Sequence, residues 1–434
     1  MNKKDIKELV NKKDIKWIQV HFTDIIGGLR VLHIPANRFL DDDILKKGIN
    51  FDGSSIGFRK VEKSDMIALP DVETFKPLSY KKDEAMIRAD LYDTDYEIYR
   101  ADPRNILKIA VAKAKKEGFD EVRISPEMEF CSFSLKESDQ DADKIEKTSY
   151  FSPPPMDNLM EYRKKLSDVL IESGYQVKYQ HHEKGKFQHE IEVEELETVK
   201  AADFCSFFKF LAREIAMLFN IDITFMPKPL SDEAGSGMHA HIVLYNNGKN
   251  MFLDNSNPYH LSQTAIYFIG GILDHSRGIA ALANPTLNSY KRLIPNFEAP
   301  IYIAWDQYNR SSLIRIPARK EVDIEVRNAD PAANPYLLFS ALIYAGLDGI
   351  KKKITYEPVS RNIYKMSSEE IKKYKIKQLP TNLMEALDEF ENDYVLINGI
   401  GRDAADLFIE KKRSEWNRYM GEITELDYEF YFNC

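Results

Sequence analysis

The chain has 434 residues, and its 44% hydrophobic and 30% charged content is usual for a globular protein that can bury a full core. Its 60 Lys and Arg residues against 69 Asp and Glu residues give a net charge of −9, which offers no general attraction to nucleic acid or to an anionic membrane. The three cysteines have neither the number nor the spacing of a disulfide framework or a zinc site. No apolar run approaches the roughly 20 residues that span a bilayer, and the amino terminus lacks the pattern of a signal peptide. We therefore expect a cytoplasmic protein.

The first hundred residues predict a small α+β unit. Residues 15–22 and 29–34 are rich in β-branched and aromatic side chains. Gly27 and Gly28 lie between them, which is typical of two strands joined by a turn.

A clear helix follows and marks a change of organisation. It opens with Pro103 in its first turn and ends at Gly118, with apolar side chains on one stripe. We place a domain boundary just before it, so that the two predicted domains cover residues 1–100 and 101–434. Beyond the boundary, helical patterns alternate with short strands, without the regular order of a βαβ fold. The further predicted helices cover residues 158–173, 199–219, 335–350 and 403–418, and another follows the capping pair Ser367 and Glu370.

Several predicted strands carry pairs of polar side chains on one face. Side chains two apart on a strand point to the same side of the sheet, so Glu127 and Glu129 share a face. Further runs show the same alternation. They contain His239 with His241, Glu325 with Arg327, Glu190, and the dense cluster 181–183.

These polar faces have two interpretations. Half-exposed antiparallel strands commonly turn charged residues toward water, and for any one strand that is the simpler interpretation. A solvated face usually mixes in Lys, Thr and Ser, however, whereas these runs concentrate Glu and His. Crowded carboxylates repel one another unless cations lie among them, and several Glu with one His suit Mg²⁺ or Mn²⁺ better than zinc. The pattern therefore favours a site for divalent cations.

Four arginines of the second predicted domain supply the opposite charge. They are Arg292, Arg310, Arg315 and Arg327. Guanidinium groups beside metal-binding carboxylates suit a substrate that carries carboxylate and phosphate groups. Surface salt bridges remain the alternative for any one of them.

Two other phosphate-binding patterns can be dismissed. The chain has no P-loop sequence. The run 399–404 resembles the glycine pattern of a dinucleotide fold, but the chain ends about 30 residues later and leaves no room for the further strands of that fold. We expect these glycines at a helix entry. Gly235 and Gly237 lead into a strand instead, where we expect the backbone to approach a ligand closely.

Eight short runs occur in order along essentially the whole chain. They are 51–56 (FDGSSI), 125–130 (SPEMEF), 181–190 (with HHE and QHE at its ends), 225–230 (FMPKPL), 235–239 (GSGMH), 284–300 (NPTLNSYKRLIPNFEAP), 309–311 (NRS) and 330–337 (DPAANPYL). Together they resemble a class I glutamine synthetase, of the short subclass that is not adenylylated. So many ordered runs make a chance similarity implausible.

The resemblance implies an α+β fold with a β-grasp N-terminal domain. It also implies a catalytic domain whose curved antiparallel sheet forms an active-site funnel. The implied reaction is the ATP-dependent ligation of ammonium to the γ-carboxylate of L-glutamate through a γ-glutamyl phosphate, with two or more Mg²⁺ or Mn²⁺ ions per site. The implied assembly is a homo-oligomer of two stacked hexameric rings, a dodecamer, with active sites between neighbouring subunits.

The resemblance also implies roles for individual residues. Asp52 of an adjacent subunit would bind and deprotonate ammonium with Ser55 nearby, and Glu298 would lie on a flap that keeps water out. The implied metal ligands are Glu129, Glu183 and Glu190 in one site and Glu127, His239 and Glu325 in the other. The implied partners of glutamate are Arg292, Arg327 and the backbone at Gly235, and those of the nucleotide and its phosphates are His241, Arg310, Arg315 and Lys320.

Several positions depart from the family pattern, mostly where the nucleotide is expected. Asp323 stands in place of Arg and Lys178 in place of Glu, and these two changes could compensate each other's charge. Val243 and Ala234 replace Ser and Asn, and Phe187 replaces Gly in a turn between metal ligands. No departure affects an implied metal ligand or glutamate-binding arginine, so we favour an active glutamine synthetase. Two alternatives stay open: a γ-glutamyl-amine ligase for a polyamine or ethanolamine, and a related assembly protein with weak or lost catalysis.

Two aromatic features complete the pattern. Tyr364 aligns with a tyrosine that some relatives adenylylate, and we expect an unmodified surface residue here. The aromatic residues of 428–432 lie at the chain end, where a core is an unlikely destination. We expect this apolar tail to dock one ring against the other.

Overall fold

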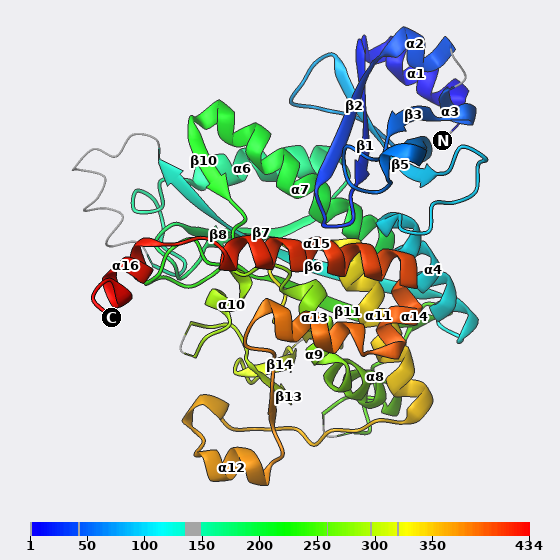
Figure 1. Cartoon of the computed structure of the whole chain (residues 1–434). Helices are drawn as coiled ribbons and strands as arrows, with labels where there is room; N and C mark the ends of the chain where they lie inside the picture. Colours follow the sequence, from blue (N-terminus) through cyan, green and yellow to red (C-terminus); the bar gives the residue numbers. More distant parts are fainter. Residues whose placement is uncertain (1, 42–43, 135–148, 258, 296, 319–320) are drawn as a thin grey trace.

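The structure is a computed structural model that describes residues 2–41, 44–134, 149–257, 259–295, 297–318 and 321–434. A small sheet lies in the amino-terminal part and a larger sheet in the remainder (Figure 1). The first part contains α1 (Lys3–Lys13), β1 (Trp17–Thr23), β2 (Leu29–Pro35), α2 (Ala36–Asp41), α3 (Ile44–Lys47), β3 (Ile49–Asp52), β4 (Asp65–Pro77) and β5 (Glu84–Tyr92).

The remainder of the chain builds the larger part. Its strands are β6 (Glu121–Ser134), β7 (Val177–His182), β8 (Gln188–Val193), β9 (Leu196–Glu197), β10 (Ile221–Thr224), β11 (Met238–Asn246), β12 (Lys249–Asn250), β13 (Tyr302–Gln307), β14 (Ser312–Ile316), β15 (Ile324–Val326) and β16 (Lys377–Gln378). Its helices are α4 (Pro103–Lys116), α6 (Met160–Glu172), α7 (Thr198–Phe219), α8 (Gln263–Asp274), α9 (Ser276–Ala283), α10 (Ser289–Arg292), α11 (Pro335–Lys352), α12 (Ser368–Lys373), α13 (Leu383–Glu391), α14 (Tyr394–Ile400), α15 (Arg402–Met420) and α16 (Glu425–Tyr431). The part of the chain that is described contains no helix long and apolar enough to cross a membrane.

The small sheet has the strand order β2-β1-β5-β4-β3. Its strands β1 and β2 form the predicted antiparallel hairpin, while β1 and β5 run parallel. Gly27 in the hairpin turn has a φ of 90°, a conformation that favours glycine, and a Cβ there would lie 3.0 Å from the Cα of Asn334. The side chain of Asn334 donates to the carbonyls of Asp24 and Ile25. The hairpin is thereby fastened to the start of α11.

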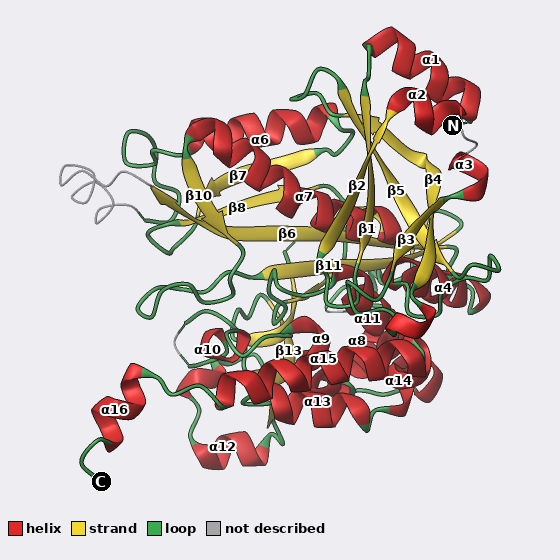
Figure 2. Ribbon diagram, turned by 45° about the horizontal axis from the view of Figure 1, so that its top comes forward, coloured by secondary structure: helices red, strands yellow, loops and turns green. Residues whose placement is uncertain are grey.

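The larger sheet has the order β16-β13-β14-β15-β11-β6-β8-β7 along its main path. Its neighbouring strands are antiparallel, with one departure from the expected pattern: β13 and β14 run parallel. Helices α6 and α7 pack on strands β6, β7 and β10, whereas α8, α9 and α13 gather on the other side of the sheet (Figure 2). The predicted α+β class is confirmed.

The predicted helices form with small shifts at their ends, as α4, α6, α7, α11 and α15. The capping box before α12 is also confirmed, because the Ser367 side chain accepts from the Glu370 backbone and the Glu370 side chain accepts from the Ser367 backbone. Gly401 has a φ of 90° and lies between α14 and α15. The glycine run near residue 400 is therefore a helix junction, and a helix precedes it where a dinucleotide fold needs a strand.

The two parts of the molecule are joined by a buried arginine in the first turn of α4. Arg104 donates to Asp90 of β5 at 2.7 Å and to Asp203 of α7 at 3.0 and 3.1 Å, and its guanidinium lies 2.9 Å from Asp71 of β4. The hydroxyl of Tyr336 in α11 donates to the same Asp203 at 2.6 Å. One guanidinium thus holds two strands of the small sheet against two helices of the larger part.

Helix α16 projects away from the body at the end of the chain (Figures 1 and 2). The exposed fractions of its aromatic residues and of Phe432 just beyond it are 60% for Tyr428, 64% for Phe430, 60% for Tyr431 and 74% for Phe432. These rings are therefore not part of the hydrophobic core of their own chain. Docking of one hexameric ring of subunits against the other through this segment stays a prediction.

His275, between α8 and α9, lies between two carboxylates. Its Nδ1 is 2.6 Å from Asp393 Oδ2 and its Nε2 is 3.0 Å from Asp348 Oδ2. Burial alone would lower the pKa of His275, but the two carboxylates outweigh burial and raise this pKa above its usual value.

We expect the substitution His275→Gln to lower the free energy of unfolding by about 1–3 kcal/mol near pH 6, where the imidazolium is charged. Because the pKa of His275 is raised in the folded state, this stabilisation is complete below the unfolded-state pKa of about 6.5 and is lost as the pH rises through the folded-state pKa. Urea unfolding of wild type and variant at low and high pH measures the difference. An equal difference at both pH values would contradict the electrostatic explanation.

Candidate active site

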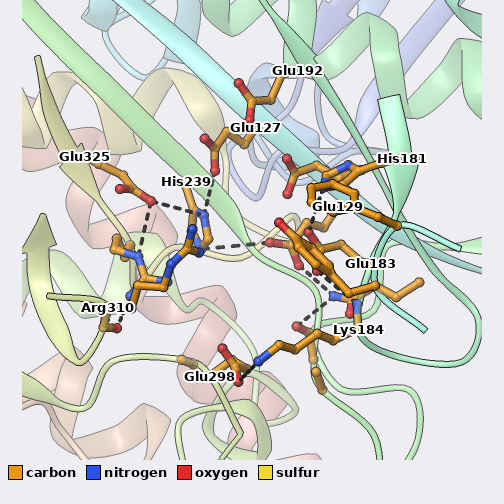
Figure 3. Close-up of a pocket in the computed structure, with 18 of the residues that line it drawn as sticks. Glu127, Glu129, His181, Glu183, Lys184, Glu192, His239, Glu298, Arg310 and Glu325 are labelled. Carbon is orange, nitrogen blue, oxygen red and sulfur yellow. Dashed lines mark hydrogen bonds and ion pairs between the residues drawn. The ribbon is translucent and has the colours of Figure 1, made fainter. Parts of the chain in front are cut away.

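A cavity of about 660 Å³ brings together most of the residues that the sequence singled out (Figure 3). Those that line it are Glu127, Glu129, Glu183, Glu190, Gly235, His239, Arg292, Glu298, Arg310, Arg315, Glu325 and Arg327. All six implied metal ligands and all four arginines are in this set. The larger sheet and the loops around it supply them from distant points of the sequence.

The register of the strands explains this convergence. Glu127 of β6 pairs with His239 of β11 on one side and with Glu192 of β8 on the other. Two residues further along β6, Glu129 pairs with Glu190 of β8. Side chains directly opposite on antiparallel strands have Cβ atoms about 4.5–5.5 Å apart, so the register alone brings these carboxylates together.

The same rule places the charges at the other side of the cavity. Glu325 of β15 pairs with His241 of β11 and with Arg315 of β14. His181 of β7 pairs with Glu190. Acids, imidazoles and guanidiniums therefore follow one another across the six neighbouring strands β14, β15, β11, β6, β8 and β7.

Glu127 lies between two histidines. Its Oε2 is 2.8 Å from His239 Nδ1, and its Oε1 is 2.7 Å from His241 Nε2. Burial acts to raise the pKa of Glu127, but the two histidines outweigh burial and hold this pKa well below its usual range. On its far side, His241 Nδ1 lies 3.3 Å from Asp323 Oδ1. Burial opposes a charge on His241, yet Glu127 and Asp323 raise its pKa to about 10.

The negative charges of the neighbouring acids are less well balanced by positive side chains. Burial, with Glu127, Glu129 and Glu183 adding to it, raises the pKa of Glu190 well above its usual value. Burial also raises the pKa of Glu129, and burial with Glu127 raises that of Glu192. Such a group is stable as a set of carboxylates only when cations lie among its members.

The donor set fits hard divalent cations. Ligand atoms lie within 4.8 Å of one another in three groups: Glu127, His241 and Glu325; His181, Glu183 and Glu190; and Glu127, Glu190 and Glu192. Carboxylate oxygens with few imidazoles suit Mg²⁺ or Mn²⁺. The expected His239 lies close to the first group, with Nδ1 2.8 Å from Glu127 and 3.6 Å from Glu325. The three groups thus add His181, Glu192 and His241 to the predicted ligands. Glu129, a predicted ligand, belongs to none of the three groups.

The arginines also contact this cluster. Arg315 pairs with Glu325 through its Nε, and Arg327 Nε lies 3.2 Å from the other oxygen of Glu325. Although burial acts to raise the pKa of Glu325, Arg327 and His241 lower it. Arg292 is 2% exposed and donates to the carbonyl of Asn328 at 2.6 Å. Guanidinium groups therefore supply positive charge beside Glu325, and the buried Arg292 adds another in the cavity wall.

The glycines before β11 allow the chain to pack closely on itself. A Cβ on Gly235 would lie 2.3 Å from the Pro227 carbonyl oxygen and 2.8 Å from Arg292 Cγ. A Cβ on Gly237 would lie 2.8 Å from Arg292 Nη2 and 2.9 Å from His239 Nε2. The absence of side chains here lets Arg292 lie close to the backbone in the cavity wall. The expected approach of this backbone to a ligand stays a prediction.

Asp52 and Ser55 do not line this cavity. Asp52 ends β3 in the small sheet and is exposed. Its carboxylate accepts hydrogen bonds from the Ser54 hydroxyl at 2.6 Å, the Ser54 backbone at 2.8 Å and the Ser55 hydroxyl. These bonds lower the pKa of Asp52 to about 2. Asp52 is thus an oriented, ionised carboxylate away from the cavity of its own chain.

A smaller cavity of about 280 Å³ contains His241 and three of the positions that depart from the family pattern, namely Lys178, Val243 and Asp323. Lys178 Nζ lies 3.8 Å from Glu192 Oε2, and Asp323 lies against His241. Each changed charge therefore has a partner of opposite sign within the site. Another such position, Ala234, lines the main cavity.

Two further predictions have different outcomes. Lys320 lies outside the described residues. Tyr364 is partly buried, and its hydroxyl donates to the Ala299 carbonyl at 2.7 Å. The expectation of a surface tyrosine is therefore corrected, because the hydroxyl is hydrogen-bonded beside Glu298. That Tyr364 is unmodified stays a prediction.

Sequence reasoning assigned no role to several residues that line the main cavity. Among them are Tyr150, Phe151, Lys184 and Glu192. Glu192 continues the two-residue alternation that identified Glu190, so the same rule could have found it. The ring centres of Phe151 and Tyr150 lie 4.7 and 5.4 Å from that of His181. This contact joins a loop to a strand, and no local sequence pattern predicts it.

Comparison with known proteins agrees with this geometry. Family models described as the beta-Grasp domain and the catalytic domain of glutamine synthetase match residues 14–94 and 100–431. The curated glutamine synthetase of Methanosarcina mazei is 39% identical over 429 residues, covering 97% of this chain and 95% of that protein. The glutamine synthetase of Thermus thermophilus is 37% identical over 440 residues, covering 99% of this chain and 98% of that protein.

Solved structures show the same similarity. One described as a GmaS/ADP complex aligns with a TM-score of 0.90 at 28% identity, covering 98% of this chain and 99% of that one. A cryo-EM structure of Plasmodium falciparum glutamine synthetase aligns with a TM-score of 0.87 at 27% identity, covering 99% of each chain. The fold expected from the sequence, a β-grasp domain followed by a catalytic domain, is confirmed. The chain belongs to the glutamine synthetase family.

We expect Glu190→Gln to raise the metal-free melting temperature by about 1–4 °C and to reduce the stabilisation by added Mg²⁺ or Mn²⁺. The pKa of Glu190 is raised in the folded state, so its ionised form opposes folding at neutral pH unless a cation is bound. Calorimetry with chelator and then with each metal measures both effects. The exposed acid Glu197 offers a matched control in Glu197→Gln. A lower metal-free melting temperature with an unchanged metal effect would contradict this account.

Proposed function

We propose that this chain catalyses the ATP-dependent formation of L-glutamine from L-glutamate and ammonium. One observation carries the proposal: a single cavity contains the acids that suit divalent cations, with arginines that suit carboxylates and phosphates beside them. Relatives named glutamine synthetase that match nearly the full chain support it.

Arg292 and Arg327 would hold the carboxylates of glutamate. Arg292 is buried against Gly235 in the cavity wall, and Arg327 is held by Glu325 and by the backbone carbonyl of Arg310. Guanidinium donors that are held in this way fix a carboxylate in one orientation. The γ-carboxylate would then point toward the acids of β6 and β8.

Phosphoryl transfer makes the γ-carboxylate reactive. An amine does not displace oxide from a carboxylate, so ATP first transfers its terminal phosphoryl group to a γ-carboxylate oxygen, and phosphate becomes the leaving group. Arg310 and Arg315 in the cavity wall would stabilise the negative charge that spreads over the transferring group. Mg²⁺ or Mn²⁺ held by Glu127, Glu129, Glu183, Glu190, His239 and Glu325 would neutralise further phosphate charge.

The second step needs ammonium next to the acyl phosphate. Asp52 is ionised, with a pKa of about 2, and such a carboxylate attracts the cation more than it accepts its proton. Because Asp52 lies outside the cavity of its own chain, we propose that it completes the site of an adjacent copy, with Ser55 orienting it. Glu298 at the cavity rim would keep water from the acyl phosphate.

The same reasoning extends to the assembly and to the domains. A site completed by an adjacent copy requires a homo-oligomer, and we propose stacked rings with twelve copies, joined through the exposed aromatic residues of α16. We place the boundary between the two domains at residues 100 and 101, just before α4.

A γ-glutamyl-amine ligase is the second candidate. The rings of Tyr150, Phe151 and His181 form an aromatic wall beside Glu183, and aromatic faces next to a carboxylate suit an alkylammonium ion. Retention of Asp52 and Ser55 favours ammonium itself.

An amine panel tests the main proposal. With ATP, glutamate and Mg²⁺, we expect phosphate release and amide formation to be at least about tenfold more efficient with ammonium than with methylamine, ethanolamine or a polyamine. Coupled phosphate release and mass spectrometry of the products measure both. A preference for a larger amine would establish the second candidate, and no turnover with any amine in a protein that binds Mg²⁺ would favour the assembly-protein alternative.

A mixing experiment tests the role of Asp52. We expect Asp52→Asn and Glu129→Gln each to be nearly inactive as pure proteins. Co-expressed in equal amounts, they should recover about one quarter of wild-type activity, because about one site in four then combines an intact Asp52 with an intact Glu129 of the neighbour. Activity of the mixture equal to the mean of the two pure variants would show that each site is built from one chain.

A further inference from the structure

The turn between β7 and β8 brings a lysine to the rim of the main cavity. Lys184 Nζ lies 2.6 Å from Glu298 Oε1, and both residues line the cavity (Figure 3). Their side chains are 56% and 49% exposed, so the pair lies at the mouth of the cavity and not at its floor. The two residues are 114 positions apart in the sequence, and only the fold joins them.

The turn that carries Lys184 is fastened to the cavity floor. The backbone N–H of Lys184 donates to Glu183 Oε2 at 3.0 Å. Four residues further along, the Gln188 backbone donates to the Gly185 carbonyl at 2.9 Å, and the Gln188 side chain donates to Glu129 Oε2 at 2.7 Å. Lys184 therefore extends from a fixed support that also contacts two of the proposed metal ligands.

Glu298 lies in an irregular segment with a φ of 68°, a conformation that is unfavourable for a residue with a side chain. Contacts on either side anchor the backbone of the segment. Lys228 Nζ lies 3.5 Å from the ring centre of Phe297, and the carbonyl of Ala299 accepts from Tyr364. The carboxylate of Glu298 is held by Lys184.

We propose that Lys184 is a positioning residue that holds the Glu298 carboxylate across the cavity mouth. The chemical consequence rests on the proposed function: a displaced Glu298 admits water to the γ-glutamyl phosphate. The water oxygen then bonds to the γ-carbon, the bond from that carbon to the phosphate oxygen breaks, and glutamate and phosphate are released. Because an exposed ion pair shifts an equilibrium only about two- to fivefold, Lys184 biases the position of Glu298 and still lets substrates enter.

The test compares Lys184→Met with wild type, with the charge-preserving Lys184→Arg, and with Lys186→Met. Lys186 lies on the same turn, but its Nζ faces Glu233 at 4.0 Å, which makes it a matched control. We expect Lys184→Met to raise the phosphate released without amide formation about two- to fivefold, with the KM for glutamate and the melting temperature unchanged. Lys184→Arg and Lys186→Met should keep the wild-type ratio. Lys184→Gln serves as a second neutral variant if the Met variant folds poorly.

Hydrogen exchange of the backbone amides of residues 297–299 in the substrate-free protein gives a readout without catalysis. We expect exchange to be about two- to fivefold faster in Lys184→Met and unchanged in Lys186→Met. If these amides exchange in Lys184→Met at the same rate as in the wild type, the positioning role is overturned, whether or not the protein forms glutamine. Absence of glutamine formation by the wild type, with faster exchange in Lys184→Met, would overturn the proposed function and leave the positioning role supported.

Discussion

The crowding of carboxylates in one cavity is the constraint on which the rest of the site depends. Buried acids such as Glu127, Glu190 and Glu192, whose oxygens lie within 4.8 Å of one another, cannot all carry charge unless positive charge lies among them. The strand register makes the crowding unavoidable, because Glu127 and Glu129 of β6 lie directly opposite Glu192 and Glu190 of β8. A protein that keeps this arrangement must supply the positive charge from its own side chains or take it from solution.

The structure does both, for different acids of the cavity. Glu127 and Glu325 have histidines and arginines as partners, and these lower the pKa of both acids in spite of burial. Burial and neighbouring acids raise the pKa of Glu129 and Glu190 instead. Side chains of the chain itself therefore balance part of the charge of Glu127 and Glu325, whereas Glu129 and Glu190 depend more on cations from solution. A substrate with phosphate groups would add further negative charge, for which the arginines that line the cavity offer partners.

The joint between the two parts of the molecule has a functional consequence. Arg104 holds the small sheet against α4 and α7, and Asn334 holds the β1–β2 hairpin against α11. These contacts keep Asp52 on an exposed strand end, away from the cavity of the same chain. Its carboxylate is nevertheless ionised and held in one orientation by two hydroxyls, which suits it to bind a cation. The chain is thus consistent with a site that is finished by a neighbouring copy.

Local rules were enough to predict much of this molecule from its sequence. Helix caps, the hairpin glycines and the alternation of Glu and His along strands depend on neighbours within a few residues, so the helices and the polar faces could be identified. The resemblance of ordered runs to a known family then named the roles of residues such as Arg292 and Glu298. Only the tertiary structure decided which strand faces meet. It also decided that Lys178 lies beside Glu192, that Asp323 lies beside His241, and that Lys184 contacts Glu298. These are contacts between residues distant in sequence, and their existence depends on strand register and loop paths that no local preference specifies.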